Sequence, residues 1–295
     1  MTTLQDKRCF LTGAASGIGR ATALAAAAKG AVLFLTDLDA VRLEATVRDI
    51  RAAGGKVAAH RALDVSDYEA VQAFAEVIHD EFGSMDVVMN IAGISVWGAV
   101  DSLEHRHWRQ VIDVNLMGPI HVIESFVPDM IRAGRGGHLV NVSSAAGLFG
   151  LPFHAAYSGA KFGLRGVSEV LRFDLERHGI EVTLVCPGAV NTGLVETIQI
   201  VGAGLSQEEF DRLREDFRRR AVTPETAARA ILRGVTRNEY LVFTSNETRI
   251  GHWVQRKVGF LYERTMRKLN DRLYRAAKPL PPTRGHRRGT EARAA

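Results

Sequence analysis

A glycine-rich segment near the N-terminus constrains the fold of this chain more than any other feature. Residues 12–19 read Thr-Gly-Ala-Ala-Ser-Gly-Ile-Gly; they follow a short apolar run, Cys9–Leu11, and precede an alanine-rich run over residues 20–29. The two runs predict a strand and a helix. Glycine lets backbone N–H groups approach a pyrophosphate, and the helix N-terminus favours negative charge. The order therefore predicts a dinucleotide-binding loop, although a glycine turn without a ligand is an open alternative. Its cofactor-binding residues are Gly13, Ser16, Gly17, Ile18 and Gly19.

Asp37 predicts which dinucleotide is preferred. It ends a second apolar run, Val32–Thr36, about twenty residues beyond the glycines. A carboxylate there can accept hydrogen bonds from both ribose hydroxyls of an adenosine, and it would repel a 2′-phosphate. No Lys or Arg lies within the glycine loop or directly after Asp37, although Arg42 is not far away. NAD is therefore predicted, with NADP the less favoured cofactor, and Asp39 is predicted to be a strand-end turn residue or a cap.

A tyrosine and a lysine four residues apart, Tyr157 and Lys161, suggest proton transfer. Four residues make about one helical turn, so the two side chains share a face. A nearby ammonium stabilises the phenolate and is expected to lower a tyrosine pKa that starts near ~10. Ser144 follows an apolar run thirteen residues before Tyr157. Tyr-x-x-x-Lys alone is a weak signal, and the glycine loop and Asp37 give it support.

Together these motifs resemble the short-chain dehydrogenase/reductases, in the single-domain branch with Thr-Gly-x-x-x-Gly-x-Gly and Tyr-x-x-x-Lys. The resemblance covers roughly residues 5 to 245, with the motifs in order. It implies that Asp64-Val65 holds the adenine, that residues 187–192 grip the nicotinamide carboxamide, and that residues 90–93 form the family's Asn-Asn-Ala-Gly strand end. Ile91 replaces the second Asn, which puts one strand-stabilising contact in doubt. The implied cofactor contacts are Asp64, Val65, Asn90, Ala92, Gly93, Pro187, Gly188, Val190 and Thr192, besides Asp37, Tyr157, Lys161 and the glycine loop.

The resemblance also implies a mechanism, a hydride transfer between nicotinamide and the carbon of a ketone or secondary alcohol. Tyr157 would exchange the proton with the substrate oxygen and Ser144 would orient that oxygen. Lys161 would hold the nicotinamide ribose, and Asn115 would complete a proton relay to solvent. For Ser143 a structural role is favoured. The implied fold class is α/β, a doubly wound parallel sheet (Rossmann fold) in a single domain; the residues themselves add a helical basic C-terminal extension, in which the chain departs from a minimal member of the family.

Apolar runs agree with that fold. They recur at Val32–Leu35, Val87–Met89, Leu139–Val142 and Val182–Val185, with helical stretches between them. This alternation predicts a parallel sheet of about seven strands. The chain of 295 residues with 46% hydrophobic content is sufficient for one catalytic domain, expected over residues 1–245 and holding both the cofactor and the substrate sites.

Cysteine, histidine and leader patterns exclude several classes. Cys9 and Cys186 fall in predicted core strands, so free buried thiols and a reducing compartment are expected. No His-Glu-x-x-His pattern occurs and no metal site is predicted; His105 and His107 are expected to face solvent. Neither a signal-peptide pattern nor an apolar run long enough to span a membrane is present. A cytoplasmic location, or a peripheral one at a membrane, is predicted.

The expected substrate is lipophilic, of steroid, retinoid or long-chain alcohol type. Apolar side chains follow the fourth strand, fill residues 148–153 and recur beyond Thr192, and about half of them are expected to be ordinary core. A capping box at residues 206–209 predicts a helix to about Arg220, in a segment that is often a mobile lid in this family. A 3-oxoacyl-thioester reductase is the nearest alternative, and a non-catalytic dinucleotide-binding regulatory protein is an alternative of another class.

The C-terminal part is basic and amphipathic. Residues 249–295 hold thirteen Lys or Arg and three Asp or Glu, a net charge of +10 that leaves −5 for the rest of the chain. Apolar residues recur at helical spacing from Val254 to Leu273, so residues 246–278 are predicted to form an amphipathic basic helical extension and residues 279–295 a disordered tail. The helix is expected either to dock on its own domain or a neighbouring subunit, or to lie on a membrane. A homo-oligomer is expected by analogy, and nucleic-acid binding is not.

Overall fold

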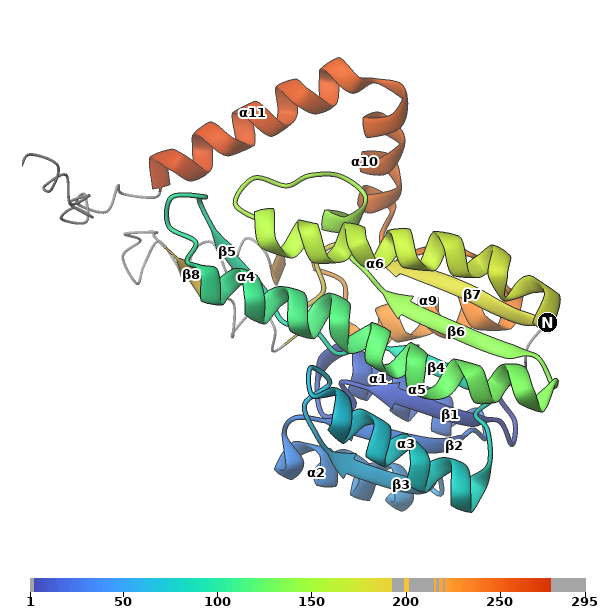
Figure 1. The fold of residues 1–295 in the computed structure, drawn as a ribbon. Coiled ribbons are helices and arrows are strands. Elements are labelled where there is room, and N and C mark those ends of the chain that lie inside the picture. Colours follow the sequence, from blue (N-terminus) through green and yellow to red (C-terminus); the bar gives the residue numbers. More distant parts are fainter. Residues whose placement is uncertain (1–2, 193–198, 202–214, 216–217, 220, 277–295) are drawn as a thin grey trace, which may run out of the picture.

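A seven-stranded parallel sheet forms the centre of the molecule (Figure 1). The computed structural model describes residues 3–192, 199–201, 215, 218–219 and 221–276. Strand order is β3-β2-β1-β4-β6-β7-β9. From β1 the chain adds strands first towards one edge, β2 and β3, and then towards the other edge, from β4 to β9, so the strand order reverses between β1 and β4. The strands are β1 (Arg8–Thr12), β2 (Val32–Asp37), β3 (Lys56–Ala62), β4 (Val87–Asn90), β6 (Gly137–Val142), β7 (Ile180–Cys186) and β9 (Leu241–Phe243). The predicted fold class and strand number are confirmed.

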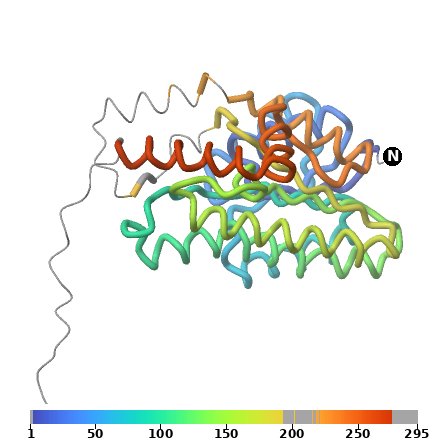
Figure 2. Tube along the Cα trace, turned by 90° about the horizontal axis from the view of Figure 1, so that it is seen from above, coloured from blue at the N-terminus to red at the C-terminus, as the bar shows by residue number. Residues whose placement is uncertain are grey.

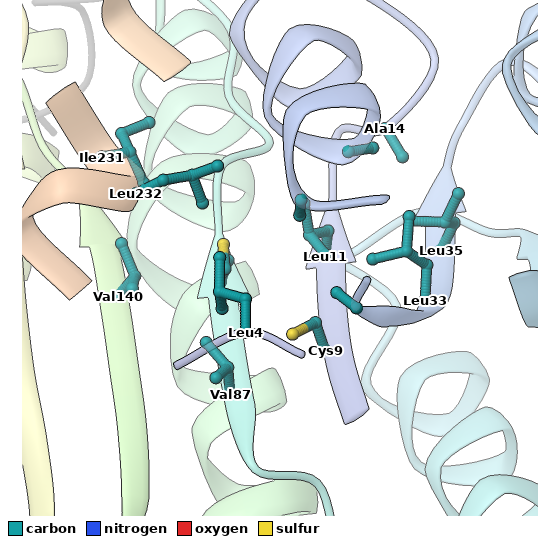
Figure 3. Close-up of a cluster of buried hydrophobic side chains, with 14 of the residues drawn as sticks. Leu4, Cys9, Leu11, Ala14, Leu33, Leu35, Val87, Val140, Ile231 and Leu232 are labelled. Atoms are coloured by element: carbon teal, nitrogen blue, oxygen red, sulfur yellow. The ribbon is translucent and has the colours of Figure 1, made fainter. Parts of the chain in front are cut away.

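Helices cover both faces of the sheet. Buried side chains pack one face against α1 (Gly17–Ala27), α2 (Ala40–Ala52) and α9 (Pro224–Arg237). The opposite face packs against α3 (Tyr68–Phe82), α5 (Gly118–Ala133) and α6 (Ala155–Asp174). Figure 3 shows the first core, in which Ile231 and Leu232 of α9 approach Val140 and Val87 of the sheet. Strands buried on both faces need continuous apolar runs, which is what the sequence supplies.

Local signals set the helix ends. The Asp39 carboxylate accepts a hydrogen bond from the Arg42 backbone N–H at 3.0 Å, so the predicted cap of α2 is confirmed. α4 (His105–Ile112) runs into α5 through a π-helical turn, η1 (Asp113–Met117). Two short 3₁₀ turns, η2 (Ala145–Gly147) and η3 (Glu176–His178), precede and follow α6. Cys9 and Cys186 are free and buried, as expected, and burial raises the pKa of each thiol to about 12.

A second, two-stranded sheet was not expected from the sequence. It pairs β5 (Val96–Gly98) in parallel with β8 (Gln199–Val201). The pairing joins the segment after β4 to the segment beyond Thr192, and each strand has only three residues. Runs this short carry no alternation that sequence reasoning can detect. The helix predicted from the capping box at Ser206 to Arg220 lies almost wholly outside the described residues.

The predicted C-terminal helicity is found as two helices. α10 (Asn246–Lys257) leaves the sheet after β9, and α11 (Gly259–Ala276) runs back across the molecule over the loop between β6 and α6 (Figures 1 and 2). The Tyr262 hydroxyl donates to the Gly150 carbonyl at 3.0 Å, and the Tyr274 ring packs edge-on to Phe153 with centroids 5.0 Å apart. One side of α11 therefore docks on its own chain. No helix in the described ranges is long and apolar enough to cross a membrane.

Candidate functional site

The glycine loop lies at the carboxyl end of β1, beside the place where the strand order reverses. Gly13 has φ +72°, and a Cβ there would lie 2.9 Å from the Ala92 backbone, so only glycine fits without displacement. The Thr12 hydroxyl oxygen accepts from the N–H groups of Ile91 and Ala92 at 3.0 and 3.1 Å. These bonds join the ends of β1 and β4. Their donors are the backbone N–H groups of residues 91 and 92, so they do not require a particular side chain at position 91.

Asp37 holds the glycine loop in place, a role that the sequence did not indicate. One carboxylate oxygen accepts from the Ala15 backbone N–H at 2.9 Å, and the other accepts from the Asp39 N–H at 3.0 Å. Arg42 also reaches this region, where its guanidinium lies 3.4 Å from the Asp39 carboxylate. The expected cation near Asp37 is therefore already paired with another acid.

A cleft of about 530 Å³ opens along the carboxyl ends of β1, β2, β3 and β4. This volume is in the range of small-molecule sites. It brings together the predicted residues Gly13, Ser16, Gly17, Ile18, Gly19, Asp37, Asp64, Val65, Ala92, Gly93 and Thr192. Sequence reasoning missed other lining residues, among them Leu38, Gln110 of α4 and Val114 of η1. Leu38 and Val114 are neighbours of predicted site residues in the chain, whereas no local pattern marks Gln110.

Besides Tyr157 and Lys161, four predicted cofactor residues lie outside this cleft. The Asn90 side-chain amide donates to the side-chain oxygen, Oδ1, of Asn141 at 2.9 Å, inside the sheet. The Pro187 carbonyl accepts from the Ala145 N–H at 2.7 Å, which joins the end of β7 to the turn after Ser144. Gly188 lies against the first turn of α10, since a Cβ on it would come within 3.2 Å of the Ser245 hydroxyl. Val190 forms an isolated bridge with Val222.

Asn115 and Lys161 meet at Gly93, on the edge of the cleft. A Cβ on Gly93 would lie 2.8 Å from Asn115 Oδ1 and 3.5 Å from Lys161 Nζ. Asn115 is fully buried in the π-helical turn; its Oδ1 accepts from the Ile94 N–H at 2.9 Å and its Nδ2 donates to the Ile94 carbonyl at 2.8 Å. The Lys161 ammonium donates to the Val142 carbonyl at 3.0 Å. The π-helical turn thus brings one amide beside the ammonium.

Ser144 and Tyr157 are hydrogen-bonded to each other. Ser144 caps η2, where its hydroxyl oxygen accepts from the Ala146 N–H at 3.1 Å, and Tyr157 lies in the first turn of α6. Ser143 instead donates to the Lys161 carbonyl at 2.9 Å and is buried, in keeping with the structural role expected for it. The four candidate catalytic side chains therefore converge from β6, η1 and α6, although they do not line the cleft itself.

The pKa of Tyr157 differs from the expectation. Burial raises the pKa of Tyr157, while the hydrogen bond with Ser144 acts in the opposite direction. Lys161 Nζ lies 5.8 Å from the centroid of the Tyr157 ring and donates to the Val142 carbonyl. Burial also lowers the pKa of Lys161 to about 8. Lys161 is therefore mostly cationic at neutral pH.

An aromatic group beside Tyr157 was not predicted. The His154 ring lies 4.4 Å from Trp97 of β5 and 6.2 Å from Tyr157, between ring centroids. Burial lowers the pKa of His154 to about 4, so the ring is neutral at pH 7. His107 was expected to face solvent, and that is wrong: it is buried and its Nδ1 accepts from the Glu104 N–H at 3.0 Å. No cluster of metal-ligating side chains occurs among the residues with a described placement.

Comparison with known proteins places this architecture. The family model for short chain dehydrogenases matches residues 7–200. SadH of Mycobacterium tuberculosis, named as an oxidoreductase without a stated substrate, is 38% identical over 90% of this chain and 95% of its own length. A 3-oxoacyl-[acyl-carrier-protein] reductase, FabG, of Thermotoga maritima is 35% identical over 66% of this chain and 78% of its own.

Two solved structures bear on the cofactor. A short chain dehydrogenase/reductase from Burkholderia phymatum in complex with NAD is 28% identical, with a TM-score of 0.76 over 87% of this chain and 96% of that one. A metagenomic short-chain oxidoreductase in complex with NADP is 30% identical, with a TM-score of 0.65 over 82% and 96% of the two chains. On the family model and these likenesses, the protein belongs to the short-chain dehydrogenase/reductase family and is an oxidoreductase of that family.

Proposed function

We propose that the protein transfers a hydride between NAD and the carbon of a secondary alcohol or ketone, with Tyr157 exchanging the proton. The observation that carries the proposal is the approach of Asn115 and Lys161 to Gly93 at the edge of the cleft, with the Tyr157 ring 5.8 Å from Lys161 Nζ and Ser144 bonded to Tyr157. Nicotinamide, when bound, supplies or accepts the hydride. In the reductive direction the phenol of Tyr157 donates its proton to the carbonyl oxygen, and in oxidation the Tyr157 phenolate takes the proton from the alcohol.

The other three side chains orient the substrate oxygen, hold the cofactor and relay the proton. The Ser144 hydroxyl, already bonded to Tyr157, orients the same substrate oxygen. Lys161 is buried and mostly cationic at neutral pH, so it can hold the nicotinamide ribose by charge-assisted hydrogen bonds. Asn115 fixes the Ile94 backbone beside it and supports a proton relay from Lys161 towards solvent. Asn90, Pro187, Gly188 and Val190, which lie outside the cleft, are proposed to contact the cofactor at its nicotinamide end.

NAD is the cofactor we propose, and NADP is less favoured. The residues fit a dinucleotide, because the Gly13 backbone lies too close to Ala92 for any side chain, and the glycines at the N-terminus of α1 line the cleft where phosphates are favoured. Asp37 places a carboxylate at the end of β2, where an adenosine ribose would lie. Arg42, the nearby cation, is paired with Asp39 and is a weak counterweight to that charge.

A lipophilic substrate suits the surroundings of Tyr157. Ile94, Val96, Trp108 and Val201 pack with Tyr157 in one apolar group, whereas Leu148 and Phe149 pack on the ends of β7 and β9 as ordinary core. A 3-oxoacyl-thioester reductase is the alternative, and the relative named FabG is the observation that favours it. A non-catalytic dinucleotide-binding regulator would keep the cleft and lack turnover.

We also propose two associations of the protein, one between copies of the chain and one with a membrane. A homo-oligomer is supported by exposed apolar side chains along α6, at Phe162, Val170 and Phe173. Peripheral association with a membrane is proposed for α10 and α11, whose residues carry most of the basic excess of the described chain. A cytoplasmic location is consistent with both.

The test is a spectrophotometric screen at 340 nm with NAD(H) and NADP(H), in both directions, against hydroxysteroids, retinoids, long-chain secondary alcohols and 3-oxoacyl thioesters. Turnover of a lipophilic alcohol or ketone with a preference for NAD(H) is expected. Faster turnover of thioesters with NADPH would favour the alternative. Tight NADH binding without turnover of any compound would favour the regulatory protein.

A further inference from the structure

The two C-terminal helices present large apolar side chains to solvent. On α10 the exposed fractions are 60% for Ile250 and 58% for Trp253; on α11 they are 76% for Phe260 and 43% for Leu261. Ile250 and Trp253 lie on α10, and Phe260 and Leu261 lie in the first turn of α11; these two helices meet at a corner that stands away from the sheet (Figure 1). Exposed side chains of this size, grouped at one place, mark an interaction site more often than a free surface.

The inner side of the same helices is already occupied. His252 of α10 is buried and its ring lies 6.0 Å from that of Phe243. On α11, Tyr262 bonds to Gly150 and Tyr274 packs on Phe153. These contacts fix which way the helices face. The apolar corner is therefore turned away from the protein's own core, and folding of the described chain does not bury it.

Cations surround the apolar corner. Arg256, Lys257, Arg264 and Lys268 are all exposed, and none of them has an ion pair within the described residues. Arg264 and Lys268 follow Phe260 at intervals of four, which places all three on one side of α11. We name these four cations together with Ile250, Trp253, Phe260 and Leu261 the C-terminal face.

We propose that the C-terminal face docks on an anionic membrane surface. Aromatic and branched side chains can enter the boundary between headgroups and acyl chains, while the arginines and lysines meet lipid phosphates and carboxylates. A nucleic acid would satisfy the charges but not the exposed Ile250 and Leu261. A second copy of the chain would bring the same four cations against each other.

Docking in this orientation would bring the substrate side of the enzyme close to the lipid. α11 then lies between the membrane and residues 149–153, the loop that leads into α6 and Tyr157. That consequence rests on the proposed lipophilic substrate; the docking itself does not. A substrate dissolved in the bilayer would reach the pocket without crossing bulk water.

The experiment is cosedimentation of the full-length protein with vesicles of phosphatidylcholine alone, or with 30% phosphatidylserine, at low salt. Binding to the anionic vesicles only, weakened by 0.5 M salt, is expected. Arg264→Gln with Lys268→Gln should weaken binding by roughly thirtyfold, since each cation near such a surface contributes about fivefold. Trp253→Ser with Phe260→Ser should weaken it to a similar degree.

Control variants carry changes of the same kind, a cation to glutamine or an apolar residue to serine, at exposed positions outside the C-terminal face. Arg177→Gln with Arg233→Gln removes two exposed cations from other surfaces, and Val41→Ser with Val77→Ser removes two exposed apolar side chains from α2 and α3. Both should bind vesicles as the wild type does. Equal loss in test and control pairs, or no binding to anionic vesicles, would overturn the proposal.

The rival occupants and the enzyme assignment are tested separately. A change of oligomeric mass in the Trp253→Ser, Phe260→Ser variant, measured by light scattering without vesicles, would identify a contact between copies instead. Binding to a DNA duplex without vesicle binding would identify a nucleic-acid surface. Tyr157→Phe protein should bind vesicles normally whether or not Tyr157 is catalytic, so failure of the enzyme assignment leaves this result unaffected.

Discussion

Replacing Asp37 with alanine is expected to affect stability as well as cofactor choice. The carboxylate accepts two backbone hydrogen bonds, from Ala15 at 2.9 Å and from Asp39 at 3.0 Å, and so anchors the glycine loop to β2. A role limited to the cofactor would leave the stability of the cofactor-free protein unchanged. The two roles can be separated because asparagine retains an oxygen acceptor but not the charge.

The size of the stability loss on Asp37→Ala follows from how deeply the two N–H donors are buried. Ala15 is buried, so its N–H loses its partner without gaining water, which costs about 1–3 kcal/mol. Asp39 is exposed, and water replaces most of its bond, at a cost of about 0.5–1 kcal/mol. The sum of about 2–4 kcal/mol corresponds to a fall in Tm of about 5–10 °C for a domain of this size.

The assay is thermal unfolding followed by circular dichroism without cofactor, beside steady-state kinetics with NAD and NADP. Asp37→Ala should lose about 5–10 °C, and Asp37→Asn about half as much, by the reasoning above. Both should narrow the gap in kcat/KM between NAD and NADP, because both remove the charge that repels a 2′-phosphate. An Asp37→Ala protein as stable as the wild type would refute the anchoring role, and a wild type that prefers NADPH would refute the specificity role.

Two further predictions concern buried titratable groups. Lys161→Ala should lower kcat and weaken NADH binding in fluorescence titrations by at least about tenfold, since Lys161 is a buried cation beside Gly93; unchanged NADH affinity would exclude a contact with the ribose. Burial lowers the pKa of His138 from 6.5 to about 4, so the folded state binds fewer protons and loses stability as the pH falls from 6.5 towards 4. The loss due to His138 between pH 7 and pH 5 is about 2 kcal/mol, and urea unfolding of His138→Gln should show a pH dependence smaller by that amount. Burial lowers the pKa of His154 to about 4 as well, so the part of the pH dependence of stability that is due to His154 remains in the His138→Gln variant.

Elements whose signals are local could be predicted from the sequence. The glycine loop, the strand ending at Asp37 and the cap at Asp39 depend on neighbouring residues, and each lies where the pattern indicated. The apolar runs also predicted the parallel sheet, because strands buried on both faces cannot tolerate polar interruption.

Features that depend on distant contacts could not be predicted. The sheet of β5 and β8 pairs segments about a hundred residues apart, and neither has a periodic pattern. The bond from Ala15 to Asp37 requires the final position of the loop over β2. His107 lies among polar neighbours in the chain, yet the capping contact with Glu104 draws it into the protein. The raised pKa of Tyr157 reflects burial, which a motif spacing does not report.

Tyr157 is the residue that we propose transfers the proton. The direct measurement is single-turnover and steady-state kinetics of Tyr157→Phe on the substrate that the screen identifies, beside NADH affinity by fluorescence. We predict a fall in kcat of at least about a hundredfold, the usual contribution of general acid–base catalysis. NADH affinity should stay within about threefold of the wild type, because phenylalanine preserves the ring that packs near Lys161. Retention of most of the wild-type rate by Tyr157→Phe would contradict the account.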